Sequence, residues 1–284
     1  MQNTVFSTNK TLNINGRLLV FDTPKVMGIL NITPDSFYDG GRYLSGAAIL
    51  SQVEKMMREG ADIIDVGGYS TRPGAAAVTV REETERVAKA IGMIRREFSQ
   101  AIISVDTFRG DVAHAAVDEG ADMINDISGG ELDTALLETV ARLKVPYVLM
   151  HMRGDPQTMS GLTHYDNLLK DLLDYFHRKL HYLSSLGVTE VIIDPGFGFA
   201  KTREQNFQLL NSLENLQMAC KPIMVGISRK SMVWKTLGIP PEDALNGTTA
   251  LHAIALLKGV NVLRVHDIRE AKEVIKLITH MTAI

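Results

Sequence analysis

The sequence predicts an α/β protein built as a single (β/α)8 TIM barrel, preceded by an N-terminal β-hairpin. Two observations support this prediction. From Lys25 onward, eight short runs rich in β-branched residues alternate with longer stretches of helical periodicity. Strands joined by helical crossovers must be parallel, and eight strand–helix units in about 260 residues match the size of a closed barrel.

Residues 3–22 have the pattern of a β-hairpin. Apolar and polar residues alternate on both sides of Asn15-Gly16, a dipeptide that favours a two-residue turn with positive φ. The barrel would occupy residues 25–284, so hairpin and barrel form one domain, 1–284. The eight predicted strands are 26–30, 63–66, 102–105, 123–125, 147–150, 191–193, 223–227 and 262–265.

The predicted helices have boundary signals of their own. Thr79-x-x-Glu82 has the form of a capping box, and Asp267-x-x-Glu270 begins the last helix in the same way. Gly60 predicts the end of the first helix. The buried face of that helix is predicted to carry Ile49, Val53, Met56 and Met57.

A doubly wound open sheet is the alternative fold. It would more typically place a glycine-rich fingerprint after the first strand, and here that turn reads Asn-Ile-Thr-Pro-Asp at 31–35. No internal repeat, low-complexity segment or linker divides the chain.

Composition narrows the class of protein. Of the 284 residues, 45% are hydrophobic and 22% charged, which excludes a disordered or fibrous chain. The net charge of −3 gives no electrostatic reason to expect nucleic acid or an anionic membrane as a partner. Any anionic ligand must therefore be held by local groups.

Cysteine usage indicates the compartment. Cys220 is the single cysteine, so the chain can form neither an internal disulfide nor a cysteine-based metal cage. The first thirty residues contain no uninterrupted apolar core for a signal peptide, and no apolar run approaches the roughly 20 residues of a membrane span. We therefore expect a cytoplasmic protein.

Polar side chains follow every predicted strand. In a barrel, the carboxyl ends of the strands share the face where enzymes of this fold carry their chemistry. Several carboxylate and amide groups there suggest a flat, nitrogen-rich ring as ligand, since each can pair with an N–C–NH₂ edge. The residues at these positions are Asn31, Asp35, Thr71, Arg72, Asp106, Asn125, Met150, His151, Asp194, Lys230, Ser231, Arg264 and His266.

Each of these residues has a less specific interpretation. Asp106 and Asp194 could cap the following helices, and Lys230 could be a surface lysine or a Schiff-base nucleophile. Arg264 and His266 flank a strand residue and suit a phosphate site, although an ordinary salt bridge is the alternative for the arginine.

Seven ordered motifs make the chain resemble the dihydropteroate synthases, the folate-pathway transferases. The matching stretches are 27–37, 65–74, 104–107, 125–127, 194–199, 228–231 and 264–267. Tyr69 departs from the pattern, since the family commonly has Glu there. We expect this change to alter loop packing and to preserve the chemistry.

The resemblance implies the reaction and its residues. p-Aminobenzoate would displace diphosphate from (7,8-dihydropterin-6-yl)methyl diphosphate to give 7,8-dihydropteroate. The implied catalytic residues are Asp106, Asn125, Asp194, Lys230, Asp35 and Arg72, with Asp35 ordering the first loop. The implied pterin-diphosphate site comprises Thr71, Asp106, Asn125, Met150, Asp194, Phe199, Gly226, Lys230, Arg264, Val265 and His266. The implied p-aminobenzoate site comprises Thr71, Arg72, Pro73, Phe199, Lys230 and Ser231.

The resemblance also implies Mg²⁺ as cofactor, with Asn31 as its ligand on the leaving diphosphate, and a homodimer as the assembly. Breaking the C–O bond first would leave a cation conjugated to the pterin, which Asp106 and Asp194 can stabilise. An aromatic amine can then attack without a strong base. Arg72, Arg229, Lys230, Arg264 and His266 are expected to form a cationic cluster facing the diphosphate and the carboxylate substrate.

Three other functions remain open from the sequence. A Schiff-base aldolase would use Lys230 in the same barrel, whereas a non-catalytic pterin-binding paralogue would not need Asn31, Arg72 or Lys230. A related pterin-barrel methyltransferase is a third possibility, but the residues on the diphosphate side disfavour it.

Overall fold

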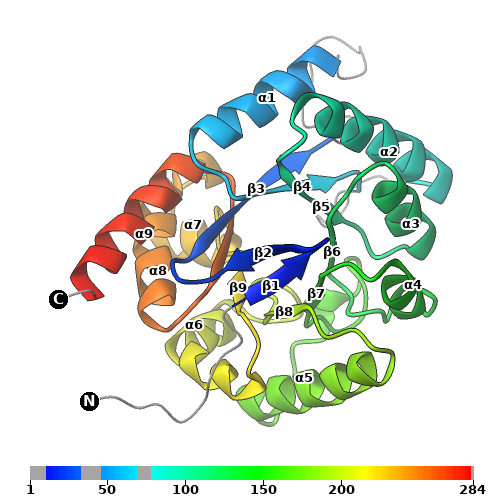
Figure 1. The fold of residues 1–284 in the computed structure, drawn as a ribbon. Coiled ribbons are helices and arrows are strands. Elements are labelled where there is room, and N and C mark those ends of the chain that lie inside the picture. Colours follow the sequence, from blue (N-terminus) through cyan, green and yellow to red (C-terminus); the bar gives the residue numbers. More distant parts are fainter. Residues whose placement is uncertain (1–10, 33–45, 70–77, 283–284) are drawn as a thin grey trace.

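The protein forms a closed barrel of eight parallel strands surrounded by helices (Figure 1). The computed structural model describes residues 11–32, 46–69 and 78–282. Neighbouring strands pair in the order β8-β7-β6-β5-β4-β3-β10-β9, and a parallel bridge between Ile193 and Ile223 closes the ring. The strands are β3 (Lys25–Asn31), β4 (Ile63–Gly67), β5 (Ile102–Asp106), β6 (Met123–Asp126), β7 (Tyr147–Met150), β8 (Val191–Asp194), β9 (Met224–Val225) and β10 (Val262–Val265).

This arrangement confirms the predicted barrel and excludes the open doubly wound sheet. The seventh strand is shorter than the predicted 223–227, because Ile223 contributes only the closing bridge and the ladder ends before Gly226. Several other strands extend one residue further than predicted, so polar residues such as Asp106 and Asp194 are themselves the last strand residues.

The hairpin consists of β1 (Thr11–Ile14) and β2 (Arg17–Val20). Asn15 and Gly16 have φ of 51° and 84°, as the predicted turn requires. Leu12 and Ile14 pack against the first residues of the barrel strands, so the hairpin closes the amino-terminal end of the barrel. In Figure 1 it lies across the centre of the ring. Residues 3–10 of the predicted hairpin lie outside the described residues.

The helices of the described chain surround the strands, and the apolar side chains between the two layers form the larger core. They are α1 (Gly46–Arg58), α2 (Val80–Glu97), α3 (Gly110–Asp118), α4 (Leu136–Leu143), α5 (Leu168–Ser185), α6 (Arg203–Asn211), α7 (Ser231–Leu237), α8 (Leu245–Leu257) and α9 (Ile268–Thr282). Short 3-10 turns are η2 (Met159–Gly161), η3 (Leu213–Ala219) and η4 (Pro241–Asp243).

The helix signals are confirmed at two positions and wrong at one. Thr79 and Glu82 form the predicted capping box at the start of α2. Gly60 has φ of 101° just after α1, and its neighbour Ala61 donates back to Met56 O at 2.9 Å. Met57 was expected on the buried face of α1 but is exposed, because it lies at the edge of the apolar stripe. Within the described ranges, the helices include none with the length and apolar character that a membrane span needs.

Candidate active site at the barrel mouth

A layer of polar side chains lies directly above the apolar floor of the barrel. Side chains alternate along a strand, so the residue two positions beyond each floor residue also points inward. Floor residues such as Ile63, Met123 and Ile192 pack with the hairpin, which fixes this alternation. The next inward layer then comprises Ile29, Asp65, Ser104, Asn125, Met150, Asp194, Gly226 and Arg264.

Arg264 ties three strands together on one side of this layer. Its Nε donates to Asp65 Oδ2 at 2.7 Å, and its Nη2 donates to Asp106 Oδ2 at 2.5 Å. Asn125 Nδ2 also donates to Asp65 Oδ2, at 2.9 Å. Two carboxylates therefore share one guanidinium, and the predicted residues Asp106, Asn125 and Arg264 do lie together.

Burial shifts the pKa values of charged groups on this side. Burial raises the pKa of Asp106 to about 7, Arg264 opposes the shift, and the neighbouring carboxylate of Asp65 adds to it. The two carboxylates in turn raise the pKa of Arg264. Asp65 is fully buried, and its Oδ1 has no hydrogen-bond partner among the described residues. The buried carboxylate of Asp65 therefore depends on the positive charge of Arg264.

Asp194 and Lys230 form the other side of the layer. Asp194 is the last residue of β8, and its Oδ1 accepts from Gly196 N at 2.8 Å. Burial raises the pKa of Asp194, while the charge of Lys230 opposes the shift. Burial likewise lowers the pKa of Lys230 to about 8, and Asp194 opposes that shift. The two groups are therefore close enough to stabilise each other's charged form.

Lys230 also faces the aromatic side of the site. It is the residue before α7, and its Nζ donates to Phe197 O while lying 4.6 Å from the centroid of the Phe199 ring. An ideal Cβ on Gly226 would lie 3.8 Å from this Nζ, in ordinary van der Waals contact, so Gly226 lies directly beside the ammonium group. Lys230, Phe199 and Gly226 thus come together as predicted.

The remaining described residues of the predicted site have different surroundings. Met150 is buried with Met152, Phe199 and other apolar residues at the mouth. The Nδ1 of His266 lies 3.1 Å from Ser228 Oγ, and Ser231 is exposed at the start of α7. Val265 is fully buried in the outer core, because it points toward the helices, so only its backbone is available to the mouth.

One prediction about the cationic cluster is wrong. The guanidinium of Arg229 donates to both carboxylate oxygens of Asp267, at 2.8 and 2.7 Å, and to Glu242 O at 3.0 Å. These contacts tie α7 to the region around α8 and α9, so the structure engages this arginine in an ion pair away from the cluster. Asp35, Thr71, Arg72 and Pro73, which were also predicted as site residues, lie outside the described residues.

Asn31 fits the ligand role that the sequence implies for it. It is the last residue of β3, and its Oδ1 lies 3.5 Å from the place where a Cβ on Gly67 would be, with Asp106 Oδ2 at 3.6 Å from the same point. Amide and carboxylate oxygens are the hard ligands that Mg²⁺ prefers. Among the described residues, no cluster of three or more His, Cys, Asp or Glu side chains could hold a metal by itself.

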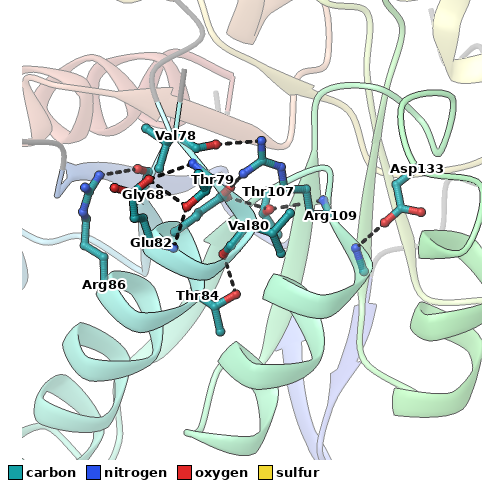
Figure 2. Close-up of polar contacts among 12 residues, drawn as sticks. Gly68, Val78, Thr79, Val80, Glu82, Thr84, Arg86, Thr107, Arg109 and Asp133 are labelled. Carbon is teal, nitrogen blue, oxygen red and sulfur yellow. Dashed lines mark hydrogen bonds and ion pairs between the residues drawn. The ribbon is translucent and has the colours of Figure 1, made fainter. Parts of the chain in front are cut away.

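The start of α2 is joined to the neighbouring loops by arginines (Figure 2). Arg86 Nη1 donates to Gly68 O at 2.9 Å, and Arg109 Nη2 donates to Val78 O at 2.9 Å. Arg109 Nη1 also pairs with the buried carboxylate of Glu83 at 2.7 Å. These contacts hold both described ends of the loop that joins β4 to α2.

Tyr69 packs as part of the same region. Its ring meets the ring of Phe108 edge to face at 5.3 Å, and the Arg109 guanidinium lies 5.3 Å from its centroid. These contacts show how Tyr69 packs, and the expected change in loop packing relative to the family stays a prediction. The preserved chemistry stays a prediction.

The sequence analysis missed two buried groups of the site. Asp65 lies within β4 and not at its carboxyl end. A carboxylate within an apolar strand is itself a signal of a functional or ion-paired group. Lys201 is buried behind the turn that follows β8, and its Nζ lies 3.1 Å from His151 Nδ1. The sequence gives no comparable signal for Lys201, because a lysine in a turn is ordinarily an exposed residue.

The barrel and the polar layer at its mouth define a pterin-binding barrel enzyme. Residues 27–266 match the family described as pterin binding enzyme. A dihydropteroate synthase from Synechocystis sp. is 44% identical over 255 residues, which cover 89% of this chain and 88% of that protein.

Two solved structures are similar over nearly the whole chain. The Yersinia pestis dihydropteroate synthase with a sulfonamide drug superimposes with a TM-score of 0.91 at 37% identity, covering 96% of this chain and 100% of that chain. The Xanthomonas albilineans dihydropteroate synthase with 4-aminobenzoic acid gives 0.90 at 38%, covering 98% and 100%. The chain belongs to the pterin-binding enzymes and, within them, to the dihydropteroate synthases, which are transferases of folate synthesis.

Proposed function

We propose that this chain condenses (7,8-dihydropterin-6-yl)methyl diphosphate with p-aminobenzoate to form 7,8-dihydropteroate and diphosphate. The observation that carries the proposal is the polar layer at the mouth, where Arg264 bridges the carboxylates of Asp65 and Asp106 and where Asp194 and Lys230 supply a further carboxylate and an ammonium group. Family membership supplies the substrate class, and the relatives with a sulfonamide drug or 4-aminobenzoic acid agree with it.

The pterin is proposed to lie among the inward side chains of the layer. Asp106, Asn125, Asp194 and Lys230 would pair with its ring nitrogens, amino group and carbonyl oxygen, with Met150, Phe199 and Gly226 lining the slot. Buried carboxylates discriminate strongly for such a ring, since each would be left unpaired by a ligand without matching donors.

The reaction is proposed to begin with cleavage of the C–O bond, and the diphosphate leaves with the bonding electron pair. The positive charge that develops on the methylene group spreads into the pterin ring, beside the carboxylates of Asp106 and Asp194. The amine nitrogen of p-aminobenzoate then forms the new C–N bond and loses a proton to solvent. No residue has to act as a strong base.

Arg264, His266 and Thr71 are proposed to hold the phosphate oxygens, and Asn31 to ligate Mg²⁺ on the diphosphate. In the described structure two nitrogens of Arg264 are already engaged by carboxylates, which leaves Nη1 as the remaining donor nitrogen. Bound Mg²⁺ would neutralise part of the charge of the leaving group. Asn31 supplies one oxygen ligand, and a site of this kind completes its shell with phosphate and water.

p-Aminobenzoate is proposed to bind among Thr71, Arg72, Pro73, Phe199, Lys230 and Ser231. Phe199 and Lys230 already lie together, and Ser231 follows on the exposed start of α7. An analogue that carries a sulfonamide in place of the carboxylate would compete for this site. We therefore expect sulfonamides to inhibit turnover competitively with p-aminobenzoate.

The protein is proposed to be a cytoplasmic homodimer whose interface includes the outer faces of α8 and α9. Ile254 and Leu257 on α8 are 41% and 55% exposed, and Leu277 and Met281 on α9 are 70% and 53% exposed. The two helices pack side by side, so these residues make neighbouring apolar surfaces (Figure 1). The single free cysteine, Cys220, agrees with a reducing compartment.

A diphosphate-release assay tests the proposed function. The purified protein is incubated with the pterin diphosphate and Mg²⁺, with and without p-aminobenzoate, and both pyrophosphate and dihydropteroate are measured. We expect equimolar products when both substrates are present. Absence of pyrophosphate under both conditions would contradict the proposal and favour a non-catalytic paralogue. Borohydride trapping of an aldehyde or ketone substrate on Lys230, through the imine that forms with loss of water, would instead favour the Schiff-base alternative.

A further inference from the structure

The turn after β8 is held mainly by side chains, one from Lys201 directly after it and others from elsewhere in the barrel. It runs from residue 195 to 200 and contains three residues with positive φ, Gly196 at 71°, Gly198 at 80° and Ala200 at 48°. An ideal Cβ on Gly196 would lie 2.1 Å from His151 O, so only glycine fits there. Such a conformation needs external contacts to be maintained, because it offers few regular backbone hydrogen bonds.

The carbonyl groups of this turn have side-chain donors. Lys201 Nζ donates to Gly196 O at 3.1 Å and to Phe199 O at 3.0 Å. Lys230 Nζ donates to Phe197 O from the side of the site. Tyr165 Oη donates to Ala200 O at 3.0 Å. Two lysines therefore donate hydrogen bonds to backbone carbonyl groups of the turn that carries Phe199.

Lys201 is the more unusual of the two lysines because it is only 7% exposed and none of its three hydrogen bonds involves a carboxylate. Its third contact is His151 Nδ1 at 3.1 Å. Burial, together with the charges of Lys201 and Arg153, lowers the pKa of His151 to about 2, so the imidazole is neutral and can accept. The three protons of a charged ammonium group therefore match three acceptors.

This burial has a cost that a surface lysine would avoid. Burial lowers the pKa of Lys201 to about 7, Asp194 opposes the shift, and Lys230 and Arg153 add to it. A methionine of similar length would avoid the desolvation but would leave Phe199 O without its donor, and Gly196 O would keep only the backbone N–H of Phe199 at 3.1 Å. The lysine therefore serves the geometry of the turn.

We propose that Lys201 is a positioning residue that fixes the 195–200 turn and thereby places Phe199 against Lys230 for p-aminobenzoate. It acts through the backbone carbonyls of the turn and touches neither substrate. The inference rests on the proposed function, since p-aminobenzoate use is the property that it explains. Pterin binding depends mainly on residues of the strands, so it should respond much less.

The test compares Lys201→Met, which removes the charge and all donors, with Lys201→Gln, which keeps an amide donor. The matched control is Lys170→Met, which removes an exposed lysine that pairs with Asp174 on α5. We expect Lys201→Met to raise the KM for p-aminobenzoate at least tenfold, about the loss that a small misplacement of a contact group produces. Lys201→Gln should lie between Lys201→Met and wild type, and Lys170→Met should match wild type.

Two further readouts separate positioning from a merely structural role. Equilibrium binding of 6-hydroxymethylpterin should change less than about threefold in both Lys201 variants, because Asp106, Asn125 and Asp194, three of the four groups proposed to pair with its ring, are strand residues. In the wild-type protein the KM for p-aminobenzoate should begin to rise near pH 7 as Lys201 loses its proton, and Lys201→Gln should show only the later rise caused by Lys230, whose pKa burial lowers to about 8. If Lys201→Met does not fold, the KM and the pH profile of Lys201→Gln decide the question.

An unchanged KM for p-aminobenzoate in the Lys201 variants would overturn the inference. An equal loss of pterin binding and p-aminobenzoate use would also overturn it, because it would indicate general collapse of the site. Failure of the proposed function is distinguishable, since it would appear as a wild-type protein that releases no diphosphate.

Discussion

The two sides of the barrel mouth carry opposite charge patterns. On the side of β4, β5 and β10, two carboxylates, Asp65 and Asp106, share one guanidinium from Arg264. On the side of β8 and α7, two ammonium groups, Lys201 and Lys230, act on the single carboxylate of Asp194. Each side therefore has one main counter-ion, and weaker interactions cross the mouth, because Arg264 also acts on Asp194 and Asp106 also acts on Lys230.

The difference in charge between the two sides explains how a protein with a net charge close to zero can bind charged substrates. Burial pushes the pKa of Asp106 up to about 7 and that of Lys201 down to about 7, so both sides contain groups that change charge near neutral pH. The carboxylates of both sides, Asp106 and Asp194, suit a developing cation on the pterin ring, whereas the lysines that occur only on the second side suit the carboxylate of p-aminobenzoate. The overall charge of −3 conceals this separation.

Removing the counter-ion of the carboxylate side should have the largest effect. Arg264→Met leaves Asp65 and Asp106 buried without a cation, and breaking a buried pair in this way costs about 3–5 kcal/mol in the free energy of unfolding. Urea unfolding at pH 8 measures the loss, which should be smaller at pH 5, where Asp106 is protonated.

The exposed pair of Arg81 and Glu85 provides the control for this comparison. Arg81→Met removes an arginine of the same size whose side chain is 87% exposed, and we expect no measurable change in stability. Equal losses in Arg264→Met and Arg81→Met would show that the carboxylate side does not need its arginine.

Removing the counter-ion of the lysine side should mainly affect binding. Asp194→Ala deletes the carboxylate proposed to pair with the pterin, and an unpaired buried donor on the ligand costs about 2–3 kcal/mol, or a 30-fold to 150-fold weaker Kd. Titration calorimetry with 6-hydroxymethylpterin measures it. Arg72→Ala, proposed to act on p-aminobenzoate, should leave this Kd unchanged, and normal turnover by Arg72→Ala would contradict its assigned role.

The pH dependence of stability gives a smaller test of the carboxylate side. An unfolded Asp ionises above about pH 4, whereas native Asp106 keeps its proton to about pH 7, because burial raises its pKa. The unfolded state therefore binds fewer protons in this window, and the stability of the wild-type protein should fall as pH rises from about 4 to about 7 through this group.

Asp106→Asn should remove that fall, so its stability relative to wild type should increase with pH across the same range. Urea unfolding at pH 5, 6, 7 and 8 provides the comparison. A relative stability that stays constant, or that decreases with pH, would show that Asp106 is already ionised at low pH in the native state.

Some residues of the two sides could be predicted from the sequence and others could not, for physical reasons. Asp106, Asn125 and Asp194 could be predicted because a strand end in a barrel has a known direction. Asp65 and Arg264 are 199 residues apart, and their pairing depends on how the ring of strands closes. Lys201 acquires its role only from the positive-φ turn around it.

The same difference between local and long-range signals applies to the N-terminal hairpin. Asn15-Gly16 predicted its turn from local backbone preference, but the sequence did not indicate where the hairpin would pack. Its position at the amino-terminal end of the barrel depends on Leu12 and Ile14 meeting floor residues from every strand. Local signals therefore fixed the elements, and long-range packing determined their neighbours.

The smallest expected effect concerns Tyr69, which lies beside the carboxylate side. Tyr69→Glu restores the residue that the family commonly carries and places a carboxylate near Arg109. It loses the edge-to-face contact with Phe108, a pair worth about 0.5–1.5 kcal/mol, and gains an ion pair that offsets part of this loss.

We therefore expect Tyr69→Glu to change the free energy of unfolding by less than about 1 kcal/mol and the KM for p-aminobenzoate by less than about threefold. Tyr69→Phe, which keeps the aromatic contact and removes only the hydroxyl, is the control and should match wild type. A large rise in KM for Tyr69→Glu alone would mean that the aromatic pair between β4 and the end of β5 directs p-aminobenzoate use. The carboxylate side would then act on p-aminobenzoate as well as on the pterin, and the assignment of p-aminobenzoate to the lysine side alone would be wrong.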